Sequence, residues 1–424
     1  SLDHNTTGND NVAVGHDALT ANTTGADNTA IGAGALDVNT TGHSNVAVGH
    51  DTLDANTTGD ENVAIGMKAL TSNTTADKNT AVGAYSLNAN TTGHDAVAVG
   101  FESLKNNTTG LYNTAVGYQA LETNTTGERN TAVGRNSLTA NTGSYNTAIG
   151  MNSMEQNSSG QYNVAVGART LVGNTTADNN TAVGRDALFA NTTGTNNTAI
   201  GRLSLAFNTT GSYNTACGEG ALESNTTADN NTGIGAKALQ LNTTGTNNTA
   251  VGAYAADAIT TADSCTVVGQ GALTVATTGS SNTAIGKASL HLTTTGTSNT
   301  AVGKEALYNN TTGTGNVGIG IEALHDCTTA NYNNAIGQGC MDKVTTGGYN
   351  NCMGADAGNG ITTGSNNSCL GHDAGRANSP SGNITTESNV ICLGNSNITD
   401  LYCADTSISS SDSRDKTDVT NFTH

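Results

Sequence analysis

The sequence has little of what a conventional globular core requires. Its 424 residues include no Trp, four Phe and a single Pro, and 35% of them are hydrophobic. No apolar run approaches the roughly 18 residues of a membrane-spanning helix, so we expect no membrane insertion. Because Pro removes a hydrogen-bond donor from a β-ladder, its near absence fits a chain that is mostly regular backbone.

Charge is also scarce. Charged residues make up 12% of the chain, and the formal net charge is −19. The chain lacks the basic surface that binds nucleic acid or anionic membranes, and we expect neither partner. All eight Cys lie at or beyond Cys217, with no CxxC pair of the metal-binding type. We therefore predict no metal site, no cofactor and no secreted disulfide framework.

What the sequence has instead is a repeat. The segment Asn107–Thr123 reads NTTGLYNTAVGYQALET, and close copies recur about 23 times at a spacing of 17 residues. We number the positions of this unit from its first Asn. Fixed residue types at fixed positions argue against a disordered tract, and a short fixed period indicates one extended solenoid rather than several globular domains.

Four positions of the unit receive structural assignments. Position eleven, Gly117 in this copy, is Gly throughout, which suits a corner with positive φ or close backbone approach. Position ten, Val116, is always apolar and position fifteen, Leu121, is mostly Leu, so we predict that both form aliphatic core columns. Position nine, Ala115, alternates with its neighbours on a short strand, and we predict that it faces a partner chain.

The repeat predicts an all-β fold. Asn, Thr, Gly and β-branched residues are poor helix formers, and no 3.6-residue apolar period is present. We predict a parallel β-solenoid (a β-roll or β-helix) of about 23 coils, which at about 4.8 Å per coil gives a rod on the order of 110 Å long. Residues 1–394 form this shaft, with a loop insertion at 376–382, and 395–410 form a transition segment.

The NTAVG core with its Gly corner resembles the YadA-like head repeats of trimeric autotransporter adhesins. The 17-residue form looks more like the shafts of bacteriophage tail fibres and related virion fibres. The resemblance covers roughly residues 5–394, and it implies a left-handed coil and a homotrimer.

The sequence SDSRDK, which begins at Ser411, resembles the start of the intramolecular chaperone auto-processing domain of phage tail fibres and tailspikes. In that family the C-terminal domain assists folding and then cuts itself off. The resemblance implies that Ser411 and Lys416 are the self-cleaving pair and that residues 411–424 are the truncated start of the domain. Because most of the chaperone is absent from this chain, we expect the pair to be inert and the chain not to be an enzyme.

Three further sets of residues are candidate sites. Tyr residues recur at position six, where exposed rings can stack on glycans: Tyr112, Tyr145, Tyr162 and Tyr213. Cys replaces Ala at position nine in three late coils, and we expect this column to meet its copies between chains, as buried thiols or as interchain disulfides: Cys352, Cys369 and Cys392. His residues share one position but lie too far apart to form one metal site within a chain: His16, His50 and His372.

We therefore expect a homotrimeric virion fibre, the shaft of a phage tail fibre, that serves host attachment. Its partners would be copies of itself, other virion tail proteins and a host-surface glycan or protein receptor. The alternative is a bacterial trimeric adhesin at the cell surface, and an ice-binding solenoid is a third class. The N-T-T segments also satisfy the glycosylation sequon many times over, although stacked Asn and Thr have a sufficient structural reason. No carboxylate pair of the glycosidase type breaks the repeat.

Overall fold

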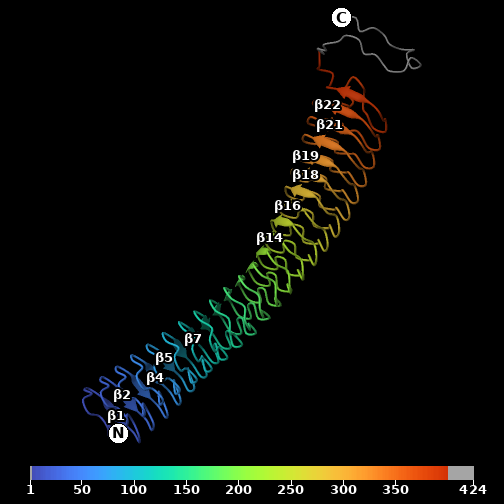
Figure 1. Cartoon of the computed structure of the whole chain (residues 1–424). Coiled ribbons are helices and arrows are strands. Elements are labelled where there is room, and N and C mark those ends of the chain that lie inside the picture. The colour runs from blue at the N-terminus through green and yellow to red at the C-terminus, as the bar shows by residue number, and fades with distance from the viewer. Residues whose placement is uncertain (1, 400–424) are drawn as a thin grey trace.

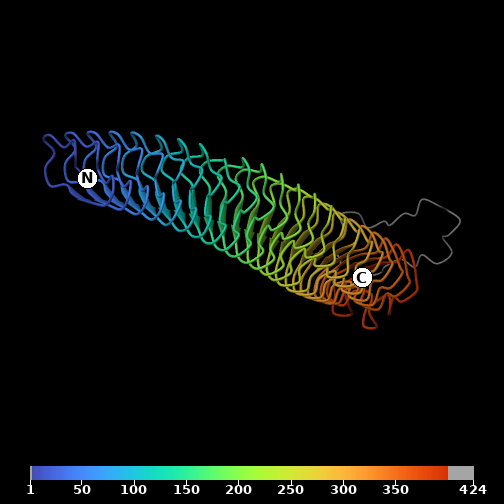
Figure 2. The same cartoon turned by 90° about the horizontal axis from the view of Figure 1, so that it is seen from below.

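The computed structural model describes residues 2–399 and contains 23 strands of three residues each. The strands lie one above another along one side of a long, gently curved rod (Figure 1, Figure 2), with β1 near one end of the rod and β22 near the other. Their bounds are β1 Val12–Val14, β2 Thr29–Ile31, β3 Val46–Val48, β4 Val63–Ile65, β5 Thr80–Val82, β6 Val97–Val99, β7 Thr114–Val116, β8 Thr131–Val133, β9 Thr147–Ile149, β10 Val164–Val166, β11 Thr181–Val183, β12 Thr198–Ile200, β13 Thr215–Cys217, β14 Thr232–Ile234, β15 Thr249–Val251, β16 Thr266–Val268, β17 Thr283–Ile285, β18 Thr300–Val302, β19 Val317–Ile319, β20 Asn334–Ile336, β21 Asn351–Met353, β22 Ser368–Leu370 and β23 Ile391–Leu393.

The strands form one parallel sheet in which each strand pairs with the next in the sequence. Position nine lies beside position nine of the next coil, as in the pairing of Ala115 with Ala132. The unit that begins at Asn141 is one residue shorter than the 17-residue repeat, and the pairing of Thr131 with Thr147 between β8 and β9 accommodates this deletion. The inserted loop lies between β22 and β23, where Ser368 pairs with Ile391. The register of the sheet therefore survives both irregularities, and the predicted parallel β-solenoid is confirmed.

Each coil encloses a narrow core. Leu121 at position fifteen is fully buried, as the sequence predicted, and so is Ala120 beside it. The buried residues of successive coils form one continuous hydrophobic cluster along the rod. Since one coil buries so few side chains, its neighbours above and below must supply the rest of its contacts.

Two of the predictions for the strand, the directions in which positions nine and ten face, were wrong. Ala115 does not face a partner chain: it is fully buried inside its own coil, whereas Val116 points outward and is half-exposed instead of forming a core column. The reason is the width of the coil. At Gly233, which occupies position nine, an added Cβ would lie 3.3 Å from Cγ of Leu222 and 3.1 Å from the carbonyl oxygen of Ala238. Only small side chains fit the inner side of most strands.

The Gly corner is confirmed. Gly117 has a φ of +139°, and a Cβ at this position would lie 2.6 Å from the carbonyl oxygen of Gly134 in the next coil. Both the backbone conformation and the close approach therefore require Gly. Positive φ is also imposed on ordinary side chains at positions six, thirteen and fifteen, as at Tyr112 (57°), Gln119 (52°) and Leu121 (53°).

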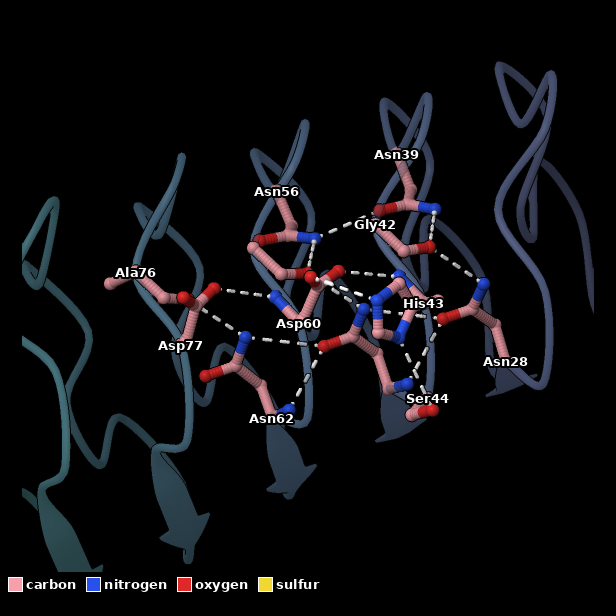
Figure 3. Close-up of polar contacts among 12 residues, drawn as sticks. Asn28, Asn39, Gly42, His43, Ser44, Asn56, Asp60, Asn62, Ala76 and Asp77 are labelled. Carbon is pink, nitrogen blue, oxygen red and sulfur yellow. Dashed lines mark hydrogen bonds and ion pairs between the residues drawn. The ribbon is translucent and has the colours of Figure 1, made fainter.

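Two ladders of buried Asn run through the coils (Figure 3). At position one, the Asn56 side-chain amide donates to Oδ1 of Asn39 at 2.8 Å and to the carbonyl oxygen of Gly59 at 3.0 Å. At position seven, Oδ1 of Asn45 accepts the backbone N–H of Asn62 at 3.0 Å. Because stacked Asn side chains hydrogen-bond to one another and to the turn backbone, these bonds offset most of the cost of removing the polar groups from water.

Candidate interaction surfaces

The outer face of the sheet is an uninterrupted apolar stripe. Position ten is apolar in all 23 strands, and its side chains point away from the core. Val14, Ile200 and Met353 expose 58%, 42% and 48% of their surface. In β1 to β19 position eight adds Thr or Val to the same face, as at Thr114 and Val97, and in β20 to β23 it is Asn334, Asn351, Ser368 and Ile391. We call these two columns the outer strand face.

Such a face is unusual for a chain that stays alone in water. Monomeric soluble proteins rarely expose contiguous apolar patches larger than a few hundred Å². The outer strand face continues from β1 to β23 and has no charged residue at positions eight or ten. It is thus the surface of the rod with the strongest physical reason to be covered.

The tyrosines of position six form an aromatic ladder with a neighbouring Arg. The Tyr145 and Tyr162 rings stack with centroids 4.9 Å apart, and the Arg129 guanidinium lies over the rings of both Tyr112 and Tyr145, at 5.1 and 5.4 Å. One Arg129 nitrogen also donates to the Tyr145 hydroxyl at 2.7 Å. These contacts join side chains from four successive coils in one stacked column.

This ladder limits how the candidate glycan contacts can act. A sugar stacks on the face of an aromatic ring, but the faces between Tyr145 and Tyr162 cover each other. The Tyr145 hydroxyl also accepts from Arg129, and the two tyrosines expose 41% and 54% of their surface. Tyr213 differs, because it exposes 61% of its surface and its neighbours at position six are Asn196 and Asn230. Of the four predicted tyrosines, Tyr213 therefore has the most accessible ring.

The cysteine column lies inside the solenoid, which excludes the predicted contact between chains. Cys352, Cys369 and Cys392 pair in register on adjacent strands, and each is at most 3% exposed. A hydrogen bond to Cys369, together with burial, raises the pKa of Cys352. All three are free thiols, as is Cys217, which lies exposed at position ten on the outer strand face.

The His residues of the shared position make local pairs. Nδ1 of His16, His50 and His372 lies 2.8, 3.0 and 3.2 Å from the carboxylate of the Asp that follows each in sequence. These side chains are largely exposed, so each pair contributes at most about 1 kcal/mol to stability. They do not come together in one site. Sequence reasoning missed a different grouping, in which His325 meets carboxylates of two coils.

The predicted self-cleaving pair, Ser411 and Lys416, lies outside the described residues, as do residues 411–424 and most of the transition segment. Among the described residues, no helix has the length and apolarity that a membrane span requires. No protein-family model matches this chain, and no curated protein sequence matches it.

Proposed function

We propose that this chain is the shaft of a virion fibre, a phage tail fibre, that assembles as a homotrimer and serves host attachment. The observation that carries the proposal is the outer strand face. A rod whose one apolar stripe runs its whole length is suited to pack lengthwise against copies of itself, and three such stripes meeting around an axis would remove all three from water.

The repeat supports a mechanical role. Backbone hydrogen bonds link each coil to the next well beyond the strands, as from Thr108 N–H to the carbonyl oxygen of Thr125 at 2.8 Å and from Leu121 N–H to that of Ser137 at 3.0 Å. A stack joined in this way holds its ends at a fixed separation. Such a rod can carry a receptor-binding surface away from a particle.

The host contact belongs to the variable positions that face outward. Positions five, six, twelve and thirteen change from coil to coil, while the core positions vary much less. Tyr213 exposes 61% of its surface, the most among the four predicted tyrosines, and we propose it as a contact for a host glycan. Other tail proteins would bind at the ends of the shaft, and the location of the protein would be the virion.

Immunogold electron microscopy tests this function against its alternative. Antibodies raised against the shaft would be applied to virus particles and to bacterial cells from the same source. We expect label on fibres of the particles. Label confined to bacterial surfaces would overturn the proposal in favour of a cell-surface adhesin, and label on neither would reject both.

An ice-binding role is the second candidate that a specific observation favours. From β1 to β19 the outer strand face presents Thr or Val at position eight and, except at Cys217, an aliphatic residue at position ten, as at Thr198 and Ile200. The adjacent Thr6 and Thr7 are less suitable, since the Thr6 hydroxyl donates to the carbonyl oxygen of Thr23 at 2.8 Å. Ice binding needs this face free, so a monomer with thermal hysteresis would favour it over the fibre.

A further inference from the structure

One cluster of side chains joins two coils near the C-terminal end of the rod. His325 and Asp326 end one coil, and Asp342 occupies in the next coil the position that His325 has in its own. Nδ1 of His325 lies 2.8 Å from Oδ1 of Asp326 and 4.0 Å from Oδ1 of Asp342. One ligand atom from each residue lies within 4.8 Å of the other two. We call these three residues the His325 cluster.

The imidazole of this cluster is held in place from one side. The Tyr308 ring stacks on it with centroids 5.2 Å apart and planes 10° apart, and His291 stacks on Tyr308 in turn at 4.9 Å. The backbone N–H of Asp326 donates to the carbonyl oxygen of Asp342 at 2.8 Å, which fixes the two coils in register. The nitrogen is therefore directed at two carboxylates without further ordering of the chain, and such preorganisation favours ligand binding.

The charge in the cluster is incompletely balanced. Among the described residues Asp342 has no ion pair except the one with His325. Burial, followed by the charge of Asp326, raises the pKa of the Asp342 carboxyl, and the charges of His325 and Lys343 only partly oppose this rise. The amide of Asn309 donates to Oδ1 of Asp326 at 3.1 Å but brings no charge. Two carboxylates and one imidazole thus face a point where a cation would be stabilised.

We propose that His325, Asp326 and Asp342 bind a divalent transition-metal ion of the Zn²⁺ class. An imidazole with two carboxylates suits Zn²⁺ better than Ca²⁺ or Mg²⁺, which prefer oxygen ligands alone. The side chains are 27%, 46% and 28% exposed, so water can complete the coordination. Because the ligands come from two successive coils, the ion would link them and oppose their separation.

A second grouping with the same residue types supplies a natural control. His372, Asp356 and Asp373 also lie within reach of one another. There, however, Nη1 of Arg376 lies 2.9 Å from Oδ1 of Asp373 and 3.4 Å from Oδ2 of Asp356. The guanidinium already supplies the positive charge, so this grouping has less reason to take up a metal ion.

The test is a titration of the full chain with Zn²⁺ alone, followed by calorimetry and by thermal unfolding. We expect one saturable site, affinity reduced more than about tenfold by His325→Asn or Asp342→Asn, and unchanged binding in His372→Asn. Zn²⁺ should raise the unfolding temperature of the wild type but not of His325→Asn. Equal Zn²⁺ binding by wild type and His325→Asn, or no saturable binding at about millimolar Zn²⁺, would overturn the proposal. Circular dichroism would verify that each variant is folded.

Discussion

At the scale of single residues, the fold depends on positions where only one side chain is compatible with the coil. The Gly of position eleven is the clearest. At Gly117 both the φ of +139° and the backbone of the next coil exclude a Cβ. At Gly220 the φ is +63°, and the nearest atom to an added Cβ is the flexible Oε2 of Glu223 at 3.3 Å. These two glycines therefore separate the cost of a clash from the cost of a left-handed conformation.

We predict that Gly117→Ala destabilises the rod by at least about 3 kcal/mol, because strain and a backbone clash add together. The matched variant Gly220→Ala should cost about 1 kcal/mol, since Ala can adopt its left-handed conformation. Urea unfolding followed by circular dichroism measures both. Equal midpoints for the two variants would show that close approach between the corners has no role in stability.

The hydrogen bonds of the buried Asn ladder can also be tested at a single residue. The amide of Asn107 donates to Oδ1 of Asn90 at 2.9 Å and to the carbonyl oxygen of Gly110 at 3.0 Å. Asn107→Asp removes both donations and buries a charge, so we expect a loss of about 3 kcal/mol at neutral pH. The neighbouring Asn106→Asp is the control, because Asn106 is only half-buried. A similar small loss of unfolding free energy in both variants, measured by urea unfolding, would show that the Asn ladder contributes little to stability.

At the scale of the strand, the sequence predicted the element but not its orientation. A three-residue strand alternates its side chains, so positions eight and ten must share one face and position nine the other. The alternation does not say which face is inside. The constant apolar character of position ten suggested that Val116 fills the core, yet the coil is too narrow for it and Ala115 fits instead. The interior width depends on how the turns close, and no single repeat unit reveals that.

The candidate sites were predicted less completely for the same reason. Repetition identified the cysteine and tyrosine columns, but whether a column faces inward or outward follows from the closed coil. The His325 cluster was missed because its members differ in type along the column: His325 lies below Asp342 in a position that the repeat leaves variable. A search for unlike residues 17 apart could have found it.

The role of the outer strand face in association can be tested by substitution. Replacing four of its outward-facing aliphatic residues with Lys should dissociate the proposed trimer while the coils stay intact, because like charges would then face one another between chains. The four substitutions are Val116→Lys, Ile200→Lys, Ile285→Lys and Ile336→Lys. Sedimentation velocity measures the loss of assembly, and circular dichroism monitors the fold.

A matched set of four Lys on another exposed column is the control for added charge. It consists of Thr109→Lys, Thr193→Lys, Thr244→Lys and Thr312→Lys, all at exposed position three. The control should remain assembled. Dissociation of both sets would mean that charge, and not the outer strand face, determines association.

Cys217 provides a native reporter of the same face. It is the exposed thiol at position ten, whereas burial raises the pKa of Cys340 to about 12. At pH 8, far below that pKa, Cys340 should hardly ionise and should react slowly in every state. Cys217 should react slowly in the assembly and rapidly in the lysine variant. Ellman's reagent measures the rates of thiol modification. The kinetic phase that disappears in the Cys217→Ser variant is the one that Cys217 contributes. Rapid reaction of Cys217 in the assembled wild type would contradict burial of this face.

At the scale of the whole molecule, the rod is a one-dimensional stack whose properties repeat along its length. Its register survives one deletion and one insertion, because each coil contacts chiefly its neighbours. The length and the parallel topology therefore follow from the repeat alone. The way the chains assemble does not follow from the repeat alone, because it depends on which column of side chains lies on the outside of the coil.

The mass of the purified chain in solution tests the central claim, which is that the outer strand face is covered by copies of the same chain. Light scattering should give three times the 42.4 kDa of one chain at micromolar concentration. A mass of one chain, with the β-solenoid intact by circular dichroism, would contradict the account.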